Sequence, residues 1–458
     1  MAVLLALGCV GCATYSPLPL GNRVGVTVGK LGVPISSMPV QPLSRHRFDP
    51  SDGLDVTEVA MLAVANNPQL KVKRDALGVA RAQAFAAGLL PDPKISAGMG
   101  YPTSSGSGLT SAFNFGISED ISALLTRSTR TAAAREHGRQ VNLELLWAEW
   151  QTIARARLLF DQVRSTHARE QLLQHEVNAL TPLDQHINQA LEAGNLTYAG
   201  AASGLDAMSS ARRQLAQAVR QHIKAEHGLR QLLGLSPGTP LHLVGAVWQA
   251  MPGADQVQQA LATLSQRRPD LLALKAGYAA QEARVRGAIL AQFPAITLGF
   301  TRARDTSNIY TSGFSIGITL PLFNRNRGNI AIARATRKRL HDAYSARLLT
   351  TRNDMDRLQQ DLASLGDEIK ALAHHAGTLD AARASAVRAW QAGMLDWPTY
   401  LTIRNKALAA DLQLLTLRQQ RDKQAIALET LLGGDWNTTG GAKVMAHATS
   451  TSSSKTSP

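Results

Sequence analysis

The first half of the chain recurs in the second half at a constant step of 201 residues, and further along at a step of 199 residues. The first step relates Pro68 to Pro269, Pro93 to Pro294, Gly98 to Gly299, Phe113 to Phe314 and Ile117 to Ile318. The second step relates Ala193-Gly194 to Ala392-Gly393, and Leu232-Leu233-Gly234 to Leu431-Leu432-Gly433. Internal repetition constrains the architecture more than any other feature. This repeat predicts a duplicated unit of about half the chain, which is too long for a solenoid repeat.

Each half begins with a helix and continues into a β-hairpin. Asn66-Asn67-Pro68 opens a helical pattern that Pro91 ends, because proline fits the first helical turn but not the interior. Apolar side chains then alternate with small or polar ones, as in strands with one apolar face. The apolar positions are Ile95, Ala97, Met99, Tyr101, Phe113, Phe115, Ile117, Ile296, Leu298, Phe300, Phe314, Ile316, Ile318 and Leu320. They predict one hairpin in residues 94–122 and one in residues 295–322, four strands in all.

The rest of each half is helical. In the first half a pattern of about 60 residues covers 131–191, or roughly 90 Å at 1.5 Å per residue. A second helix covers 197–233 and carries a coiled-coil-like seam. This helix and the one at 68–90 together match the length of the long helix. We therefore expect two antiparallel columns per half, with the strands at one end and the Gly194 or Gly393 turn at the other.

Composition and motifs exclude several classes of protein. The net charge of +14 comes from basic residues scattered along both halves, which favours a solvated face or an anionic lipid surface over nucleic acid. The sequence contains no phosphate-binding glycine loop, zinc-protease motif or serine-hydrolase motif. His374 and His375 are adjacent on a helix and point about 100° apart, and His222 on its seam fits a polar core or groove position. We predict no enzyme, no catalytic residue, no cofactor and no metal site.

The chain begins with an apolar leader, residues 1–12, that contains its two cysteines. An apolar run followed by a small residue and cysteine is typical of processed bacterial lipoproteins. Cys12 is the favoured acylation site, Cys9 is the alternative, and a third reading gives neither cysteine a role. Residues 13–53 are rich in Pro, Gly, Ser and Val and predict an extended arm, whereas the Ser- and Thr-rich residues 437–458 predict a disordered tail.

Four strands with an apolar outer face and a small or polar inner face have the pattern of an outer-membrane barrel. Four strands are too few to close, and unpaired strand edges in hydrocarbon cost several kcal/mol for each backbone group. Closure therefore requires several chains in cyclic symmetry. Three chains would supply twelve strands and twelve helical columns. The alternative is an ordinary soluble sheet packed on helices.

Over residues 55–435 the chain resembles the TolC family of outer-membrane efflux proteins. The resemblance rests on the tandem halves, Pro-Asp-Leu at 269–271, Leu-Pro-Leu-Phe-Asn at 320–324, the Ala-Gly turns and the Leu-Leu-Gly helix ends. It implies a mainly α fold of duplicated helical-hairpin and β-hairpin units, repeat 1 at 54–245 and repeat 2 at 246–436. Three copies would form a 12-stranded outer-membrane β-barrel on a long α-helical barrel.

The resemblance also implies a place in the cell. Residues 11–19 are similar to the acylated start of the lipoprotein members, which favours Cys12. The protein would be palmitoylated, anchored in the outer membrane of a Gram-negative bacterium and extended into the periplasm. Residues 323–329 look like members that serve heavy-metal or drug pumps of the resistance-nodulation-division (RND) type.

The function implied by the resemblance is a passive, gated exit duct, a homotrimer coupled to a periplasmic adaptor (membrane fusion) protein and an inner-membrane pump. The expected adaptor-docking tips are Gly194, Asn195, Leu196, Gly393, Met394 and Leu395. Family members often close the aperture with aspartates, but six and nine residues past Gly393 this chain has Thr399 and Thr402. Either Asp396 supplies the acidic gate, or Leu395 and Trp397 form an apolar closure.

Three other functions stay open at this point. A duct for type I protein secretion would have the same architecture. A soluble periplasmic coiled-coil adaptor or structural protein would lack outward aromatic strands and a lipid signal. A nucleic-acid-associated helical protein would lack the leader. Small, polar lumen faces suit metal ions, drugs and peptides alike, so the cargo is undetermined.

Overall fold

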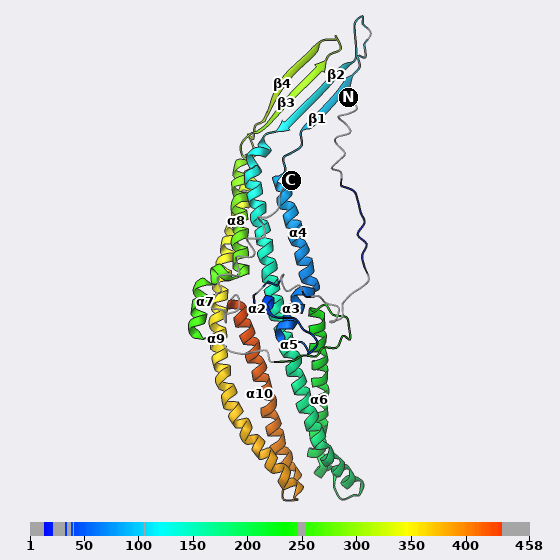
Figure 1. The fold of residues 1–458 in the computed structure, drawn as a ribbon, viewed down its shortest axis with the longest axis vertical. Coiled ribbons are helices and arrows are strands. Elements are labelled where there is room, and N and C mark those ends of the chain that lie inside the picture. Colours follow the sequence, from blue (N-terminus) through cyan, green and yellow to red (C-terminus); the bar gives the residue numbers. More distant parts are fainter. Residues whose placement is uncertain are drawn as a thin grey trace.

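The computed structural model describes residues 13–21, 33, 38–39, 41–104, 106–245 and 253–432. The molecule is elongated, with a four-stranded sheet at one end and two helical turns side by side at the other (Figure 1). The predicted leader with Cys9 and Cys12 and the predicted tail 437–458 lie outside the described residues.

In the first half, α4 (Pro68–Gly88) and α6 (Tyr198–Leu232) lie one after the other along α5 (Ser122–Glu192), as Figure 1 shows. Asn67 joins the two short helices, because its side-chain amide donates to the carbonyl of Leu232 at 2.8 Å. The predicted end-to-end column is confirmed. The predicted start of the long helix at residue 131 is wrong, because α5 follows the preceding strand almost without a loop and reaches 71 residues.

The second half repeats this arrangement with α8 (Pro269–Leu290), α9 (Arg327–Gln391) and α10 (Trp397–Leu432). α9 has 65 residues, six fewer than α5. It starts later because Asn326, immediately before it, has a left-handed backbone with φ of 54°. Among the described helices, none has the length and apolar composition required to cross a membrane.

The four strands are β1 (Lys94–Gly100), β2 (Ala112–Asp120), β3 (Ala295–Arg304) and β4 (Tyr310–Thr319). They form one antiparallel sheet in chain order, so that β2 pairs with β3 and unites the two halves. Within the described part of one copy, β1 and β4 each pair along one edge only.

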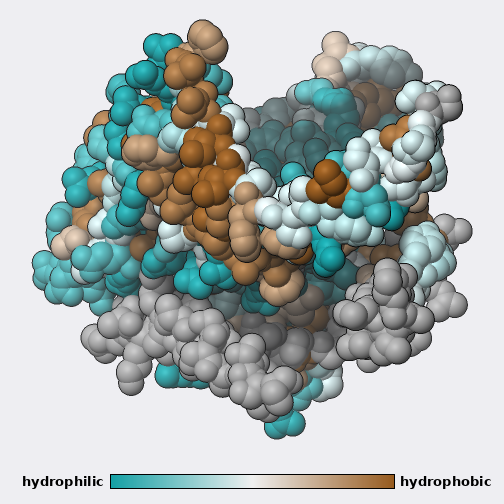
Figure 2. Space-filling view, turned by 90° about the horizontal axis from the view of Figure 1, so that it is seen from above, coloured by the Kyte–Doolittle hydropathy of each residue, from teal (hydrophilic) through white to brown (hydrophobic). Residues whose placement is uncertain are grey.

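The register places the predicted apolar residues on one face. Ile95 lies opposite Ile117, Ile117 opposite Phe300, and Phe300 opposite Phe314. Phe314 is 89% exposed, and all ten residues of β4 are exposed in a single copy. Figure 2, which looks down on the strand end, shows hydrophobic side chains gathered in one continuous patch. The predicted alternation is confirmed.

Short helices pack beside the middle of the long ones. α3 (Val56–Asn66) contributes to a core with α5 and the end of α6, and α7 (Ala254–Arg267) to a core with α8, α9 and α10. A five-residue helix, α2 (Gln41–Arg45), interrupts the arm that was predicted to be extended. No helical period marks α3 in the sequence, because seven of its eleven residues are buried.

Candidate functional site at the helical tips

Both tips turn with the same main-chain geometry. Gly194 and Gly393 have φ of 75° and 71°, the left-handed region that glycine adopts without steric cost. At the first tip, Gly194 N donates to Leu191 O at 3.0 Å, and Asn195 N donates to Ala190 O at 2.9 Å. At the second tip, Gly393 N donates to Trp390 O at 3.0 Å, and Met394 N donates to Ala389 O at 2.8 Å. Each tip is thus a Schellman helix end followed by a new helix.

The helix after each tip begins with a side-chain cap at the same repeat position. The Thr197 hydroxyl accepts from Gly200 N at 3.2 Å, and an Asp396 carboxylate oxygen accepts from Thr399 N at 3.0 Å. Asp396 is therefore the N-cap of α10, which explains an acidic residue there without reference to a gate. Its carboxylate is exposed, so it can also present charge to ions.

The predicted docking residues divide into exposed and half-buried groups. Gly194, Asn195, Gly393 and Met394 are exposed, and Met394 is 78% exposed. Leu196, Leu395 and Trp397 are half-buried and pack on one apolar cluster that joins both tips. This tip cluster contains Leu180, Leu183, Ile187, Ala201, Met208, Ala211, Ala386, Tyr400 and Leu401.

The two tips interlock through one indole ring. Trp397 at the start of α10 lies against the backbone of α6 at Gly204, where a Cβ atom would come within 3.2 Å of the ring and 2.2 Å of Ile187. Trp390 and Tyr400 stack beside it, with ring centroids 5.0 Å apart and planes 15° apart. Trp397, predicted as part of an apolar closure, thus packs between the repeats.

A buried ion pair that the sequence analysis missed joins the repeats above the tips. Arg404 on α10 donates to the two carboxylate oxygens of Glu176 on α5 at 3.1 and 2.6 Å, and to the Tyr400 hydroxyl at 3.0 Å. Both charged side chains are less than a tenth exposed. Burial opposes the guanidinium charge, but the hydrogen bonds to Glu176 and the charge of that carboxylate raise the pKa of Arg404 above its ordinary value. One feature of the sequence could have indicated this pair. Arg404 occupies the repeat position that Leu205, an apolar residue, occupies in the first half.

A polar groove of about 450 Å³ lies beside this ion pair, between α5, α6 and α10. Its polar lining includes Glu176, Ser203, Asp206, Thr402 and Asn405. Of the predicted aperture residues, Thr402 is the one that lines this groove. Its hydroxyl donates to Pro398 O at 2.9 Å. Any movement of α10 away from α5 and α6 must break the pair between Arg404 and Glu176.

Solved structures with this fold are outer-membrane channels. The CmeC channel of Campylobacter jejuni gives a TM-score of 0.73 at 15% identity, over 96% of this chain and 98% of that chain. CusC gives a TM-score of 0.69 at 20% identity, over 87% of this chain and 98% of that chain. Residues 259–434 match the sequence model of the family described as outer membrane efflux protein. The chain is therefore similar to outer membrane efflux proteins, in the sequence of residues 259–434 and in its fold.

Curated relatives show the same similarity. Outer membrane protein OprJ of Pseudomonas aeruginosa is 26% identical over 269 residues, 55% of this chain and 54% of that protein. Cation efflux system protein CusC of Escherichia coli is 26% identical over 180 residues, 37% of this chain and 39% of that protein. The chain thus spans about half or less of the length of these relatives. The predicted TolC-like fold class and the predicted outer-membrane location are confirmed.

Proposed function

We propose that this chain is the exit duct of a tripartite pump, a passive gated conduit for small toxic solutes. The sheet is the observation that supports the proposal most strongly. Its apolar face is exposed, and within the described residues of one copy β1 and β4 each pair along one edge only. Such a sheet is stable in a bilayer only when neighbouring copies pair with both edges. Three copies would close a barrel of twelve strands (3 × 4).

The helical tips support the proposed coupling to a periplasmic adaptor and an inner-membrane pump. They lie at the end opposite the strands, and Asn195 and Met394 are exposed there. A photoreactive residue at either position should form a cross-link to the adaptor in cells, whereas one at Lys338, which is 79% exposed on α9, should not. Equal cross-linking at all three positions would contradict docking at the tips.

The gate in this proposal lies beside the tips. The half-buried Leu395 and Trp397 support an apolar closure, and the pair between Arg404 and Glu176 supports a polar lock above it. Asp396 is the candidate for an acidic contribution. If Asp396→Ala left the cation selectivity of the purified channel unchanged, the acidic contribution would be absent and the apolar closure would stand.

The lipid anchor belongs to the same proposal. Cys12 is the proposed acylation site and Cys9 the alternative, and both lie outside the described residues. Labelling with a palmitate analogue should disappear in Cys12→Ser and persist in Cys9→Ser. The reverse result would assign the anchor to Cys9.

The class of solute is the part of the function with least support. CusC is named as part of a cation efflux system, and another relative, OpmQ of Pseudomonas aeruginosa (25% identical), as a pyoverdine export protein. We propose service to an RND-type pump for heavy-metal cations or drugs. A type I secretion duct is the second candidate, because the same fold would serve it.

Deletion of the gene, with susceptibility measured across metals, drugs and dyes, tests the proposal. We expect increased susceptibility to at least one class, restored by the intact gene. Loss of a secreted protein with unchanged susceptibility would favour type I secretion. Release of the protein from membranes by carbonate, with no oligomer, would favour the periplasmic adaptor and overturn the duct.

A further inference from the structure

Two histidines and a carboxylate from two helices meet well away from the tips. His167 and Glu170 on α5 and His222 on α6 place one potential ligand atom each within 4.8 Å of one another. We call these residues the α5–α6 histidine cluster. His167 lies 25 residues before the end of α5 at Glu192, or roughly 37 Å along the helix axis. The cluster is therefore separate from the proposed docking surface, and Glu170 lies six residues, or roughly 9 Å along α5, before Glu176 of the polar lock.

The helix geometry directs the three side chains to one point. Residues three apart share a helix face, so His167 and Glu170 project from α5 in the same direction. His222 approaches from α6, and the two imidazole rings lie with centroids 5.1 Å apart. Imidazole nitrogen and carboxylate oxygen together form a ligand set that suits Zn²⁺ and its neighbours in the first transition row.

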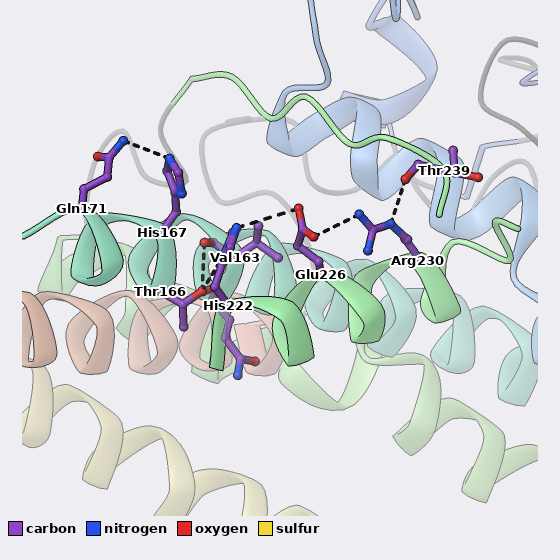
Figure 3. A network of polar contacts seen from close by, with 9 residues as sticks. Val163, Thr166, His167, Gln171, His222, Glu226, Arg230 and Thr239 are labelled. Atoms are coloured by element: carbon purple, nitrogen blue, oxygen red, sulfur yellow. Dashed lines mark hydrogen bonds and ion pairs between the residues drawn. The ribbon is translucent and has the colours of Figure 1, made fainter. Parts of the chain in front are cut away.

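Thr166 orients the ring of His222. Its hydroxyl donates to the carbonyl of Gln162 at 2.7 Å and lies 3.3 Å from Nδ1 of His222 (Figure 3). When the hydroxyl donates its proton to the Gln162 carbonyl, or to the Val163 carbonyl at 3.0 Å, the hydroxyl accepts from Nδ1–H of His222. This tautomer leaves the lone pair of Nε2 available for a cation, and a hydrogen bond at the other ring nitrogen is typical of metal-binding histidines.

The carboxylates around the cluster lack sufficient donors. Oε2 of Glu170 is shielded from solvent and has no hydrogen-bond partner in the part of the chain that the structure describes. Nε2 of His222 also faces Oε1 of Glu226 at 3.9 Å, and Arg230 holds the other oxygen of Glu226 at 3.0 Å. A buried acceptor without a donor is costly, and a cation at this point would satisfy Glu170 and the lone pair of His222 together.

A second cluster, with one histidine and two carboxylates, shows what a purely structural arrangement looks like. His46, Asp55 and Glu58 also lie within ligand distance of one another. The oxygens of Glu58 accept from the backbone N–H groups of Asp49 and Asp55 at 2.7 and 3.0 Å. Asp55 caps α3 through the N–H groups of Thr57 and Glu58. These carboxylates are occupied by the capping box, whereas that of Glu170 has an orphaned oxygen.

We propose that His167, Glu170 and His222 bind a divalent transition-metal ion of the Zn²⁺, Cu²⁺ or Ni²⁺ class, with water as the remaining ligand. The ion fastens α5 to α6 near the end of α6. The network from His222 through Glu226 and Arg230 to Thr239 extends this link to the segment after α6 (Figure 3). The sequence analysis predicted no metal site and treated His222 as a polar seam residue, so this proposal departs from it. It does not depend on the proposed efflux function.

The test uses the purified full-length protein in detergent without a histidine tag, after treatment with EDTA. We expect saturable binding of Zn²⁺ and Ni²⁺ at one ion per chain by titration calorimetry, and a higher melting temperature with Zn²⁺. Mg²⁺ should give neither effect, because imidazole is a poor ligand for this hard ion.

The variants separate metal binding from a structural role. His222→Asn keeps a donor near Thr166 but removes Nε2, and Glu170→Gln removes the anionic ligand, so each should weaken Zn²⁺ binding at least tenfold. His186→Asn, an exposed histidine of α5, is the matched control and should bind like the unaltered protein. Should His222→Asn fail to fold, Glu170→Gln decides alone. No saturable binding, or equal binding in Glu170→Gln and the control, would overturn the proposal.

Discussion

The two tips share one backbone and differ in side-chain chemistry. The turns at Gly194 and Gly393 have the same hydrogen bonds. One position after the N-cap, Tyr198 is 80% exposed in the first tip, whereas its counterpart Trp397 packs against α6. Further along, Leu205 in the first repeat corresponds to Arg404 in the second. The two copies thus share the turn, and the second copy carries an indole ring and a charge that fasten it to the first.

The largest predicted effect is loss of that charge. Arg404→Ala leaves the Glu176 carboxylate buried without its partner, which should lower the free energy of unfolding by about 3–5 kcal/mol. The counterpart Leu205→Ala should cost about 2 kcal/mol or less, because Leu205 is half-buried. Thermal and urea unfolding of the purified protein measure both. The double variant Glu176→Leu, Arg404→Leu should recover much of the loss. Equal costs for Arg404→Ala and Leu205→Ala would contradict the lock.

The next prediction concerns Asp161, whose counterpart in the second repeat is the neutral Gln360. Burial, and then the charge of Asp422, raises the pKa of Asp161 to about 7. The folded chain therefore holds this proton more tightly than the unfolded chain, and stability falls as the pH rises from about 4 to about 7. The difference from the ordinary value of 3.8 corresponds to at most about 4 kcal/mol.

Asp161→Asn should remove this dependence on pH. The variant should melt at a higher temperature than the unaltered protein at pH 8 and at nearly the same temperature at pH 4. Gln360→Asn is the matched control and should shift both melting temperatures equally. An unchanged difference between the two pH values in Asp161→Asn would show that Asp161 is not the group responsible.

A smaller effect is expected where the tips interlock. Gly204→Ala places a Cβ atom 3.2 Å from the Trp397 ring and 2.2 Å from Ile187, and the crowding should cost about 1–3 kcal/mol. In the second half, Ile403 on α10 takes the repeat position of Gly204, and Ala386 on α9 takes that of Ile187. The large and the small residue are therefore exchanged between the two helices. Gly138→Ala, with no atom near the added methyl group, should be neutral or stabilising in the same unfolding assay. A neutral Gly204→Ala would mean that the tips do not pack this closely.

The smallest effect should be the same at both tips. Gly194→Ala and Gly393→Ala place a non-glycine residue in the left-handed region, which costs about 1–2 kcal/mol. Neither new methyl group meets another atom within 4 Å, so the cost is conformational only. Asn tolerates this region, and Gly393→Asn should retain more stability than Gly393→Ala. Unequal effects of the two alanine variants would show that the shared turn is not equally required.

The repeat and the periodic patterns were sufficient to predict most of the architecture. Proline at 68 and 269 fixed the helix starts, and the alternation around Phe113 and Phe314 fixed the apolar face. The predictions were less accurate where no turn residue marks a boundary. The helix α5 begins directly after β2, and nothing in the sequence separates the two at Ser122.

At the candidate site, the sequence predicted the backbone turns of the two tips but not the side-chain contacts between them. The tip glycines were readable because each follows an alanine and ends a long helical pattern. The pair between Arg404 and Glu176 joins residues 228 positions apart on two repeats, and no local pattern reports such a contact. The meeting of His167 and His222 was not predicted for the same physical reason, because their proximity depends on how α5 and α6 pack.

The proposed duct requires that the open edges of the sheet pair within a ring of three chains. Cysteine at Ser96 on β1 combined with cysteine at Thr311 or Ser315 on β4 tests it, since these positions share the polar face. After oxidation in membranes, at least one of the two double-cysteine variants should form disulfide-linked dimers and trimers and no larger species. The single-cysteine controls should remain monomeric. Disulfide-linked species that end at two chains, or continue beyond three, would contradict a ring of three chains.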